Sequence, residues 1–245
     1  MTDRTVLSVS GEDRIGFLDG LITNTVPEQS GQIVYAALLT PQGKFIADFF
    51  VVNDGSRLLV DVASSHAAHL NQRLTMYRLR ADVQIEPTDL IVSRGIGTAP
   101  EGALADPRDA SMGWRHYGHE DVSENVDWID LQITHTIPET GVELTPDTYI
   151  LEAGFERLNG VDFKKGCFVG QEIVARMKHK TVLKKGIARV VINGDARAGD
   201  EITANGKIVG TLHSVAVEYG LAYLRFDRAE GEMQAGEATL TRADA

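Results

Sequence analysis

The residues best suited to chemistry lie in one short segment, 164–172 (KKGCFVGQE), which contains the only cysteine of the 245-residue chain. A single thiol cannot form an internal disulfide and cannot by itself hold a structural zinc ion. Lysines precede Cys167 and a helix-like run, 171–177, follows it. Because ammonium groups and a helix N-terminus favour the thiolate, the segment predicts a functional free sulfur with Lys165 beside it. The alternative is a small buried hydrophobic residue.

Basic residues and glycines surround this cysteine. Residues 164–185 contain seven lysines and arginines but one acid, Glu172, in a chain whose formal net charge is −11. A solvated lysine-rich face would explain the cluster, and so would a site for an anionic ligand or partner. The position of the cluster around Cys167 favours the second explanation. Gly166 and Gly170 allow sharp bends and a close approach of a ligand.

Composition excludes several classes of protein. The net negative charge argues against a general nucleic-acid binder, which needs a basic face. No apolar run approaches the ~20 residues of a membrane-spanning helix, and the first residues lack the apolar core of a secretory signal. The seven histidines show no metal-ligand spacing with the cysteine, and no phosphate-binding or dinucleotide-binding loop is present. We expect a cytoplasmic protein without a metal site, since one cysteine fits a reducing compartment.

Two acids stand in apolar surroundings. Asp48 interrupts the apolar run 45–52, where an unpartnered buried carboxylate would cost several kcal/mol. It therefore lies at an edge open to water, pairs with Arg78 or Arg80, or faces a pocket where it accepts hydrogen bonds from a ligand. Glu152 lies in the run 149–154 and is either a surface glutamate on a helix or a second such acceptor.

The pattern of apolar residues and turns predicts an α+β fold with helices on one face of a split β-α-β sheet. A proline and a glycine at 40–44 indicate a hairpin turn, and Ser10 is a candidate N-cap. Residues 95–118, rich in Gly, Pro and Asp, predict a connection, and residues from 182 onward predict a small β-barrel or sandwich. The expected strands are 6–9, 33–39, 45–52, 58–62, 81–85, 186–192, 201–202, 207–217 and 221–226, and the expected helices are 10–23 and 64–77.

The chain resembles the YgfZ family, folate-binding proteins related to the T-protein (aminomethyltransferase) of the glycine cleavage system. The resemblance covers roughly residues 10–228 and is most specific at the signature K-G-C-[YF]-x-G-Q-E-x-x-x-R. That signature is matched by Lys165, Gly166, Cys167, Phe168, Gly170, Gln171, Glu172 and Arg176. Supporting segments are 17–24 (FLDGLITN), 39–44 (LTPQGK), 77–81 (YRLRA), 106–108 (DPR), 113–115 (GWR) and 137–139 (IPE).

The resemblance implies a three-domain ring, as in the T-protein and YgfZ, around a central cavity that can hold tetrahydrofolate. The expected domains are a ferredoxin-like part over 1–95, a second α+β part with the signature over 96–181, and a C-terminal β-barrel over 182–245. Departures from the family pattern are Lys180 in place of arginine and Thr181 in place of glycine.

The resemblance also implies a function: folate-dependent assembly or repair of iron–sulfur clusters, with effects on client enzymes that include those of tRNA thiolation. Cys167 would be the functional thiol and Lys165 its neighbour, and the other signature residues would contribute to ligand binding. Asp48, Glu152 and Asp61 match positions that contact folate in T-proteins, although T-proteins have asparagine at the third. The expected partners are iron–sulfur client or assembly proteins, with no nucleic acid and no membrane, and a monomer is expected. The alternatives are a T-protein-like aminomethyltransferase and a pure binding protein.

Overall fold

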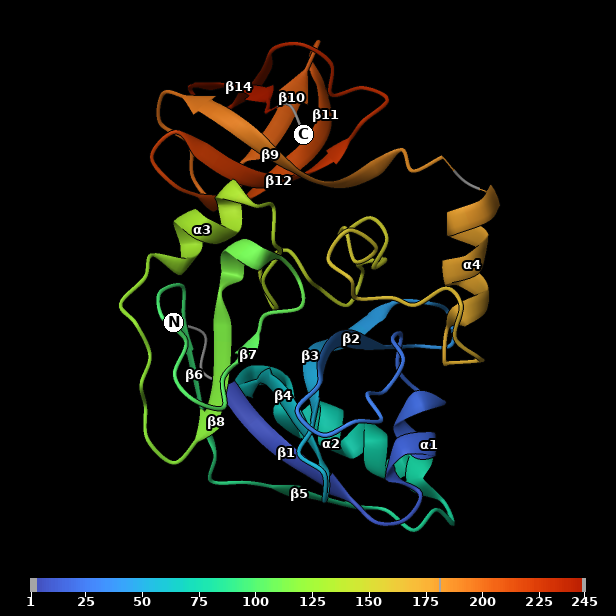
Figure 1. Ribbon diagram of the computed structural model, residues 1–245. Coiled ribbons are helices and arrows are strands. Elements are labelled where there is room, and N and C mark those ends of the chain that lie inside the picture. The colour runs from blue at the N-terminus through green and yellow to red at the C-terminus, as the bar shows by residue number, and fades with distance from the viewer. Residues whose placement is uncertain (1–3, 181, 244–245) are drawn as a thin grey trace. The chain divides into compact units, whose positions relative to one another are not determined.

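The computed structural model describes residues 4–180 and 182–243 (Figure 1). The chain divides into two compact units. The first comprises Met1–Val126 and Phe155–Ile173, and the second comprises Asp127–Gly154 and Val174–Ala245. The boundaries of the three expected domains stay a prediction, and Thr181 lies outside the described residues. Within these residues no helix combines the length and apolar character needed to cross a membrane.

The first unit is built on a five-stranded sheet in the order β2-β3-β4-β1-β5. All of its neighbouring strands are antiparallel, so β1 and β3 run parallel with β4 between them. This is the predicted split β-α-β arrangement, extended at one edge by β2. The strands are β1 (Arg4–Ser10), β2 (Ile33–Leu39), β3 (Phe45–Asn53), β4 (Leu58–Ala63) and β5 (Gln84–Pro87).

Two helices, α1 (Arg14–Asp19) and α2 (Ser64–Arg78), cover one face of this sheet (Figure 1). Leu18 of α1 and Leu74 of α2 pack with Phe49 of β3 in one buried cluster. The helix predicted from Ser10 is shorter than expected, and Ser10 ends β1 instead. The chain turns at Gly11, whose φ of 106° suits glycine and whose Cβ, if present, would lie 2.1 Å from the Asp82 carbonyl oxygen.

The opposite face of the sheet carries a second sheet that the sequence did not predict. Residues expected to form a connection contain strands β7 (Leu104–Ala105) and β8 (Trp114–Gly118), which join β6 (Ile91–Gly95) in the order β6-β8-β7. A short 3-10 helix, Ala110–Met112, lies between β7 and β8. These strands were missed because they are short and because polar residues interrupt their apolar pattern. Tyr117 and other residues of this sheet pack on a small cluster from β1, β3 and β4.

The second unit contains the predicted barrel, which is closed and has six strands in the order β10-β11-β12-β9-β14-β13. The last two strands were not predicted, because they are short and lie in a segment rich in Gly and Glu. The strands are β9 (Lys185–Asn193), β10 (Glu201–Ala204), β11 (Lys207–Val215), β12 (Tyr219–Arg225), β13 (Met233–Ala235) and β14 (Ala238–Arg242). Helix α3 (Trp128–Thr134) belongs to this unit, and α4 (Gln171–Lys180) begins in the first unit and ends in the second.

Candidate functional site

The cysteine lies on the signature loop, defined here as residues 164–170, which leads into α4. Cys167 is exposed and its thiol is free, so the alternative of a small buried hydrophobic residue is wrong. Gly166 beside it is also exposed, and a Cβ added there would meet no heavy atom within 4 Å. The sulfur therefore lies where another molecule can reach it.

Lys165, two residues before the exposed Cys167, does not extend into solvent. Its side chain is only 1% exposed. The ammonium Nζ donates to the carbonyl oxygens of Asp19 at 2.8 Å, Ile22 at 3.0 Å and Asn24 at 2.7 Å. A fourth contact joins Nζ to the Asp19 carboxylate at 3.2 Å. Lys165 thus occupies the C-terminal end of α1, where carbonyl groups lack partners within the helix.

The electrostatics of Lys165 agree with this buried position. Desolvation by burial lowers the pKa of the ammonium, and the nearby Asp19 carboxylate opposes that shift. Asp19 itself is held in place, because its Oδ1 also accepts a hydrogen bond from the Val26 backbone N–H at 3.0 Å. The geometry therefore gives Lys165 an anchoring role: it ties the signature loop to the segment that follows α1.

A second anchor precedes the loop at Asp162. Its backbone N–H donates to the Thr23 carbonyl at 3.0 Å, and its carboxylate accepts from the Thr25 hydroxyl at 2.6 Å and from the Lys164 N–H at 2.8 Å. The Thr25 hydrogen bond contributes most to a lowered pKa of this carboxyl. The two anchors explain why segment 17–24 accompanies the cysteine signature in the sequence: it provides the groups that bind the loop.

The end of the loop packs against the hairpin turn between β2 and β3. Gly170 has a φ of 85°, and a Cβ there would lie 2.7 Å from the Thr40 carbonyl oxygen. Gly43 in the turn has a φ of 73°, and its Cβ would lie 2.8 Å from the Cβ of Ile173. Both positions therefore require glycine, for backbone conformation and for close approach.

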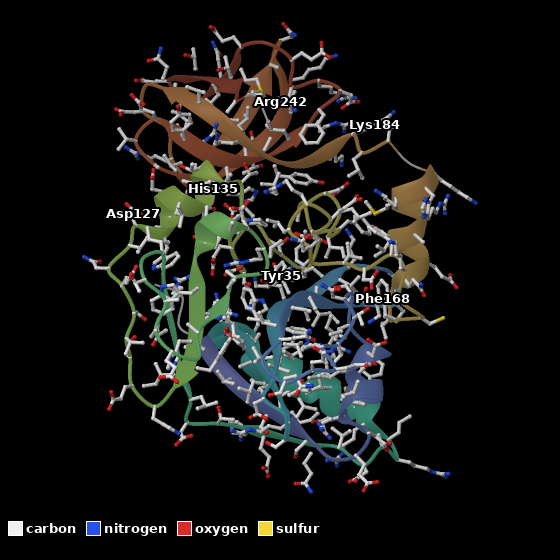
Figure 2. The ribbon with its side chains drawn as sticks, viewed as in Figure 1. Tyr35, Asp127, His135, Phe168, Lys184 and Arg242 are labelled. Atoms are coloured by element: carbon white, nitrogen blue, oxygen red, sulfur yellow. The ribbon has the colours of Figure 1, made fainter. Side chains whose placement is uncertain are left out.

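The remaining signature residues divide between core and surface. Phe168 is buried and its ring centroid lies 5.7 Å from the Lys165 ammonium, while Gln171 at the start of α4 is half-buried (Figure 2 labels Phe168). Glu172 and Arg176 are exposed on α4. Of the predicted basic cluster, Lys165 is thus withdrawn into an anchor, and the exposed members are Lys164, Arg176, Lys178, Lys180 and Lys184.

Asp48 lies on the face of β3 away from the helices and is buried. Its carboxylate accepts a hydrogen bond from the Tyr35 hydroxyl at 2.9 Å, and the Tyr35 ring stacks on Phe155 with centroids 5.0 Å apart (Tyr35 is labelled in Figure 2). The expectation of an edge position open to water is therefore wrong. Arg78, one of its suggested partners, is exposed and donates to the Val83 carbonyl. The surroundings of Asp48 combine a carboxylate with aromatic rings.

Asp61 on β4 is 0% exposed and both of its oxygens are used. Oδ1 accepts from Arg4 at 2.6 Å, and Oδ2 accepts from Arg115 at 2.6 Å and from the Tyr117 hydroxyl at 3.0 Å. Burial alone would raise the pKa of this carboxyl, but the charges of Arg115 and Arg4 outweigh burial and lower it to about 2. The role expected of Asp61, contact with folate, does not fit these surroundings.

The ion pairs continue from Arg115 into the second sheet. Arg115 contacts Asp106 at 3.3 Å, and Asp106 pairs with Arg108 at 2.9 Å, all with buried side chains. Burial would raise the pKa of Asp106, but the charge of Arg108 and its hydrogen bonds lower it. The Arg115 guanidinium also lies 3.8 Å from the centroid of the Phe50 ring. This network assigns a structural role to segments 106–108 and 113–115 of the family resemblance.

Acidification should weaken this network. Because the pKa of Asp61 is lower in the folded protein, this carboxylate contributes fully to stability above its pKa in the unfolded chain, near 4. That contribution is lost as the pH falls toward the folded-state pKa of about 2. The shift corresponds to about 2 kcal/mol of unfolding free energy. Urea unfolding at steps from pH 5 to pH 2 measures it, and Asp61→Asn should show a shallower loss over that range. An equal pH dependence in both proteins would contradict the assignment.

Glu152 belongs to the second unit. Its carboxylate accepts a hydrogen bond from the Tyr223 hydroxyl of β12 at 2.7 Å, and its backbone carbonyl accepts from the Ile187 N–H of β9 at 2.8 Å. Burial, followed by the Glu152 hydrogen bond, raises the pKa of Tyr223 well above its usual range. Glu152 is half-buried and lies in a turn against the barrel, so it is not a surface glutamate on a helix.

Sequence reasoning missed the residues that hold the site. Asp19, Thr23 and Asn24 lie in segment 17–24, which supports the family resemblance, but no individual role could be assigned to them from the sequence. Asp162 lies outside the segments that support the family resemblance. The only feature that could have indicated it is its position, two residues before the paired lysines at 164 and 165. None of these residues could be assigned a partner from sequence, because the contacts join positions about 140 residues apart.

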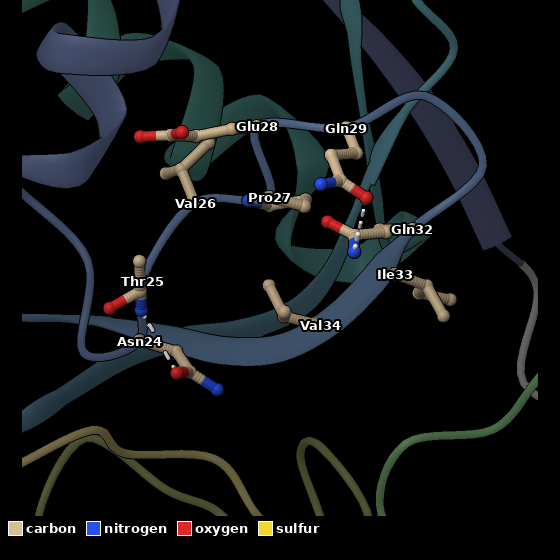
Figure 3. A pocket seen from close by; sticks show the side chains of 9 residues that line it. All are labelled: Asn24, Thr25, Val26, Pro27, Glu28, Gln29, Gln32, Ile33 and Val34. Atoms are coloured by element: carbon tan, nitrogen blue, oxygen red, sulfur yellow. Dashed lines mark hydrogen bonds between the residues drawn. The ribbon is translucent and has the colours of Figure 1, made fainter.

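A pocket of about 550 Å³ lies beside the anchoring segment, against the edge strand β2 (Figure 3). Asn24 and Thr25, whose groups hold Lys165 and Asp162, form one part of its wall. Amide side chains from Gln29 and Gln32 and the apolar Val34 form another. Its full lining is Asn24, Thr25, Val26, Pro27, Glu28, Gln29, Gln32, Ile33 and Val34.

The sequence is similar to known proteins over most of its length. The mouse and human proteins named "Iron-sulfur cluster assembly factor IBA57, mitochondrial" are each 29% identical to it over 94% of this chain and 78% of their own length. The Mycosarcoma maydis protein named "Iron-sulfur cluster assembly factor IBA57 homolog, mitochondrial" is 32% identical over 75% of this chain and 54% of its own length. A family model described as the CAF17 C-terminal beta-barrel domain matches residues 184–244, a range that includes the barrel strands β9 to β14.

A solved structure shares the fold. The glycine cleavage system aminomethyltransferase T from Bartonella henselae aligns with a TM-score of 0.79, covering 100% of this chain and 83% of that one, at 14% sequence identity. At that identity the likeness concerns the fold alone. It confirms the predicted α+β T-protein-like fold, together with the C-terminal barrel.

Proposed function

Because this chain belongs to the IBA57/YgfZ family, we propose that it supports the assembly or repair of iron–sulfur clusters in client enzymes. The proposal includes Cys167 as the functional thiol. The observation that carries it is an exposed, unpaired sulfur on a loop that Lys165 and Asp162 fix to the fold. A thiol on a loop fixed by such anchors is held in position, which is what recognition of a cluster or of a partner protein requires.

The chemistry of the thiol limits how it can act. Thiolate is the protein ligand that iron–sulfur clusters use most, and a cluster takes several such ligands. Among residues 4–180 and 182–243 there is no group of three or more His, Cys, Asp and Glu side chains that could hold a metal ion. We therefore propose that Cys167 supplies one transient ligand to a cluster whose other ligands come from a client or assembly protein, or that it acts as a redox thiol.

Replacing the sulfur tests this proposal. In a strain that lacks the gene, the wild-type chain should restore the activity of a cluster-dependent enzyme, and Cys167→Ser should leave it at the level of the empty strain. Val217→Ser, a polar change at a side chain that is 96% exposed in the barrel, serves as the control and should restore activity fully. Full rescue by Cys167→Ser would remove the thiol from the mechanism while leaving the family assignment in place.

Tetrahydrofolate binding is the second part of the proposal. Asp48 is the acceptor that the family resemblance implies, because a carboxylate can accept N–H groups of a pterin. Its neighbours in the fold are the Tyr35 hydroxyl and the buried rings of Tyr35 and Phe155. Glu152 belongs to the second unit, where it accepts from Tyr223, and its contact with folate stays a prediction from the family resemblance. The proposed contacts do not include Asp61, whose oxygens are used by arginines. The aminomethyltransferase alternative stays a prediction.

Calorimetric titration with tetrahydrofolate measures this binding directly. We expect saturable binding below millimolar concentration, weakened about tenfold or more by Asp48→Asn, which keeps the shape of the side chain but removes one acceptor oxygen. Asp54→Asn, at an exposed acid in the turn after β3, is the control and should bind like the wild type. Absence of binding to the wild type at sub-millimolar concentration would remove folate from the proposal without affecting the role of Cys167.

A further inference from the structure

We infer that the C-terminal end of α2 is a docking surface for an acidic segment of a partner protein that carries an apolar side chain. The surface consists of Met76, Arg78, Leu79 and Arg80 and is called the α2-end surface below. It contains most of segment 77–81, which neither the anchors of the signature loop nor the proposed folate contacts use. The inference is independent of the chemistry proposed for Cys167.

The first observation is the backbone conformation of Leu79. This residue follows α2 with φ 45° and ψ −103°, a region that a residue with a Cβ rarely adopts and that glycine adopts without strain. Strain of this kind persists where the surrounding structure enforces it, and it is concentrated at functional positions. Here the turn is enforced by hydrogen bonds from the Ala81 N–H to the Arg78 carbonyl and from the Val83 N–H to the Ala81 carbonyl.

The second observation is the exposure of the strained side chain. Leu79 is 88% exposed, so burial in the fold does not offset the strain of its backbone. Met76, in the last turn of α2, is 62% exposed. Single exposed apolar residues need no explanation, but Leu79 combines exposure with a strained backbone, and a second exposed apolar side chain lies three residues before it in the sequence.

The third observation is charge. Arg78 and Arg80, on either side of Leu79, are both exposed in a chain whose net charge is −11. The nearest acids along the turn are engaged with the segment before α1: the Asp82 carboxylate accepts from the Glu12 N–H, and the Asp13 carboxylate accepts from the Asp82 N–H. Leu79 is thus flanked in sequence by two arginines, of which Arg78 also donates to the Val83 carbonyl, and such a segment is complementary to an apolar side chain between carboxylates.

A protein partner fits this surface better than an anionic membrane does. Membrane attachment by charge uses clusters of about four to eight basic residues. The α2-end surface offers two, and the overall charge of the chain would oppose approach to an anionic bilayer. Arginine and large apolar side chains are also the residues that contribute most to protein–protein binding.

The substitution Leu79→Gly separates docking from folding. Glycine relieves the backbone strain and removes the apolar side chain, so it should raise the melting temperature by about 2–4 °C while it weakens docking. A loss of binding together with a gain in stability cannot be attributed to misfolding. A lower melting temperature would instead show that Leu79 stabilises the fold, and would overturn the inference.

Docking is measured with a photo-crosslinking amino acid at position 76 of the full chain in cells, followed by mass spectrometry of the crosslinked peptide. We expect one protein to dominate, joined through a peptide rich in Asp and Glu that contains an apolar residue. Leu79→Gly and Arg80→Glu should each reduce this adduct about fivefold or more. The same probe at Val217 is the control, because that residue is also exposed, 96% against 62% for Met76, but belongs to the barrel unit.

Several outcomes overturn the inference. They are no adduct from position 76, the same proteins captured from position 217, a crosslinked peptide without carboxylates, a lipid adduct, or an adduct that Leu79→Gly leaves unchanged. The proposed cluster function has its own test at Cys167, so the two can fail separately: Cys167→Ser should leave the position-76 adduct at the wild-type level.

Discussion

Replacing Arg115 with methionine should lower the free energy of unfolding by about 3–5 kcal/mol, because it leaves buried carboxylates without a charge partner. Arg115 is the only described residue that contacts both Asp61 and Asp106, and its own side chain is buried. Burial alone would lower the pKa of the Arg115 guanidinium. Interaction with Asp61, and next with Tyr117, outweighs burial and raises that pKa far above its usual range. Methionine can fill the volume but cannot neutralise either acid.

Urea unfolding at neutral pH measures this loss. The control is Arg57→Met, which removes the arginine of a surface pair with Asp54 at 2.9 Å and should change stability by less than about 1 kcal/mol. The difference between the two variants measures the combined effect of burial and of the second carboxylate, since Arg57 pairs with one acid at the surface and Arg115 pairs with two buried ones. If Arg115→Met were as stable as Arg57→Met, the buried network would contribute no more than an exposed one.

Replacing Lys165 with methionine should lower stability by about 2–3 kcal/mol and should also abolish rescue by a chain that still contains Cys167. The variant leaves the carbonyls of Asp19, Ile22 and Asn24 without the ammonium that they share. The signature loop then keeps only the anchor at Asp162, and we expect the thiol to be held less firmly. Urea unfolding and restoration of the cluster-dependent enzyme measure the two effects.

The neighbouring lysine provides a matched control. Lys164 is exposed, so Lys164→Met removes the same charge from the same loop and should leave stability and rescue close to wild type. Hydrogen exchange over residues 160–172 should increase in Lys165→Met alone, since the amides of the loop lose the support of the anchor. Identical behaviour of the two variants would show that only the charge near Cys167 matters, as the sequence first suggested.

The sequence predicted those parts of the fold that local patterns determine. The turn at 40–44 correctly placed the β2–β3 hairpin, and the alternation of short β runs with turns predicted the barrel. The sheet that contains Trp114 and Arg115 was missed, because its strands are short and are held by ion pairs rather than by an apolar stripe. The start of α1 was misplaced because Gly11, and not Ser10, determines where the chain leaves β1.

The candidate site was predicted in composition but not in arrangement. Cys167 was expected to be accessible, and it is. Lys165 was expected beside the thiol as an activating charge, yet its partners lie at the end of α1. Asp61 was expected to meet a ligand and meets arginines instead. Such partners are long-range contacts, and a single sequence records the types of residues but not which of them meet.

The hairpin turn and the signature loop each contain a glycine that lies against the other segment. These two glycines, Gly43 and Gly170, limit how the site can be transferred to another protein. Gly43 admits Ile173, and Gly170 admits the Thr40 carbonyl, so the two segments pack closely against each other. We therefore expect a synthetic peptide of the cysteine motif, which lacks the hairpin turn, to be inactive. A chimera built on a T-protein scaffold would need at least three exchanged stretches, around residues 17–25, 40–43 and 160–173, before its grafted thiol could be expected to work.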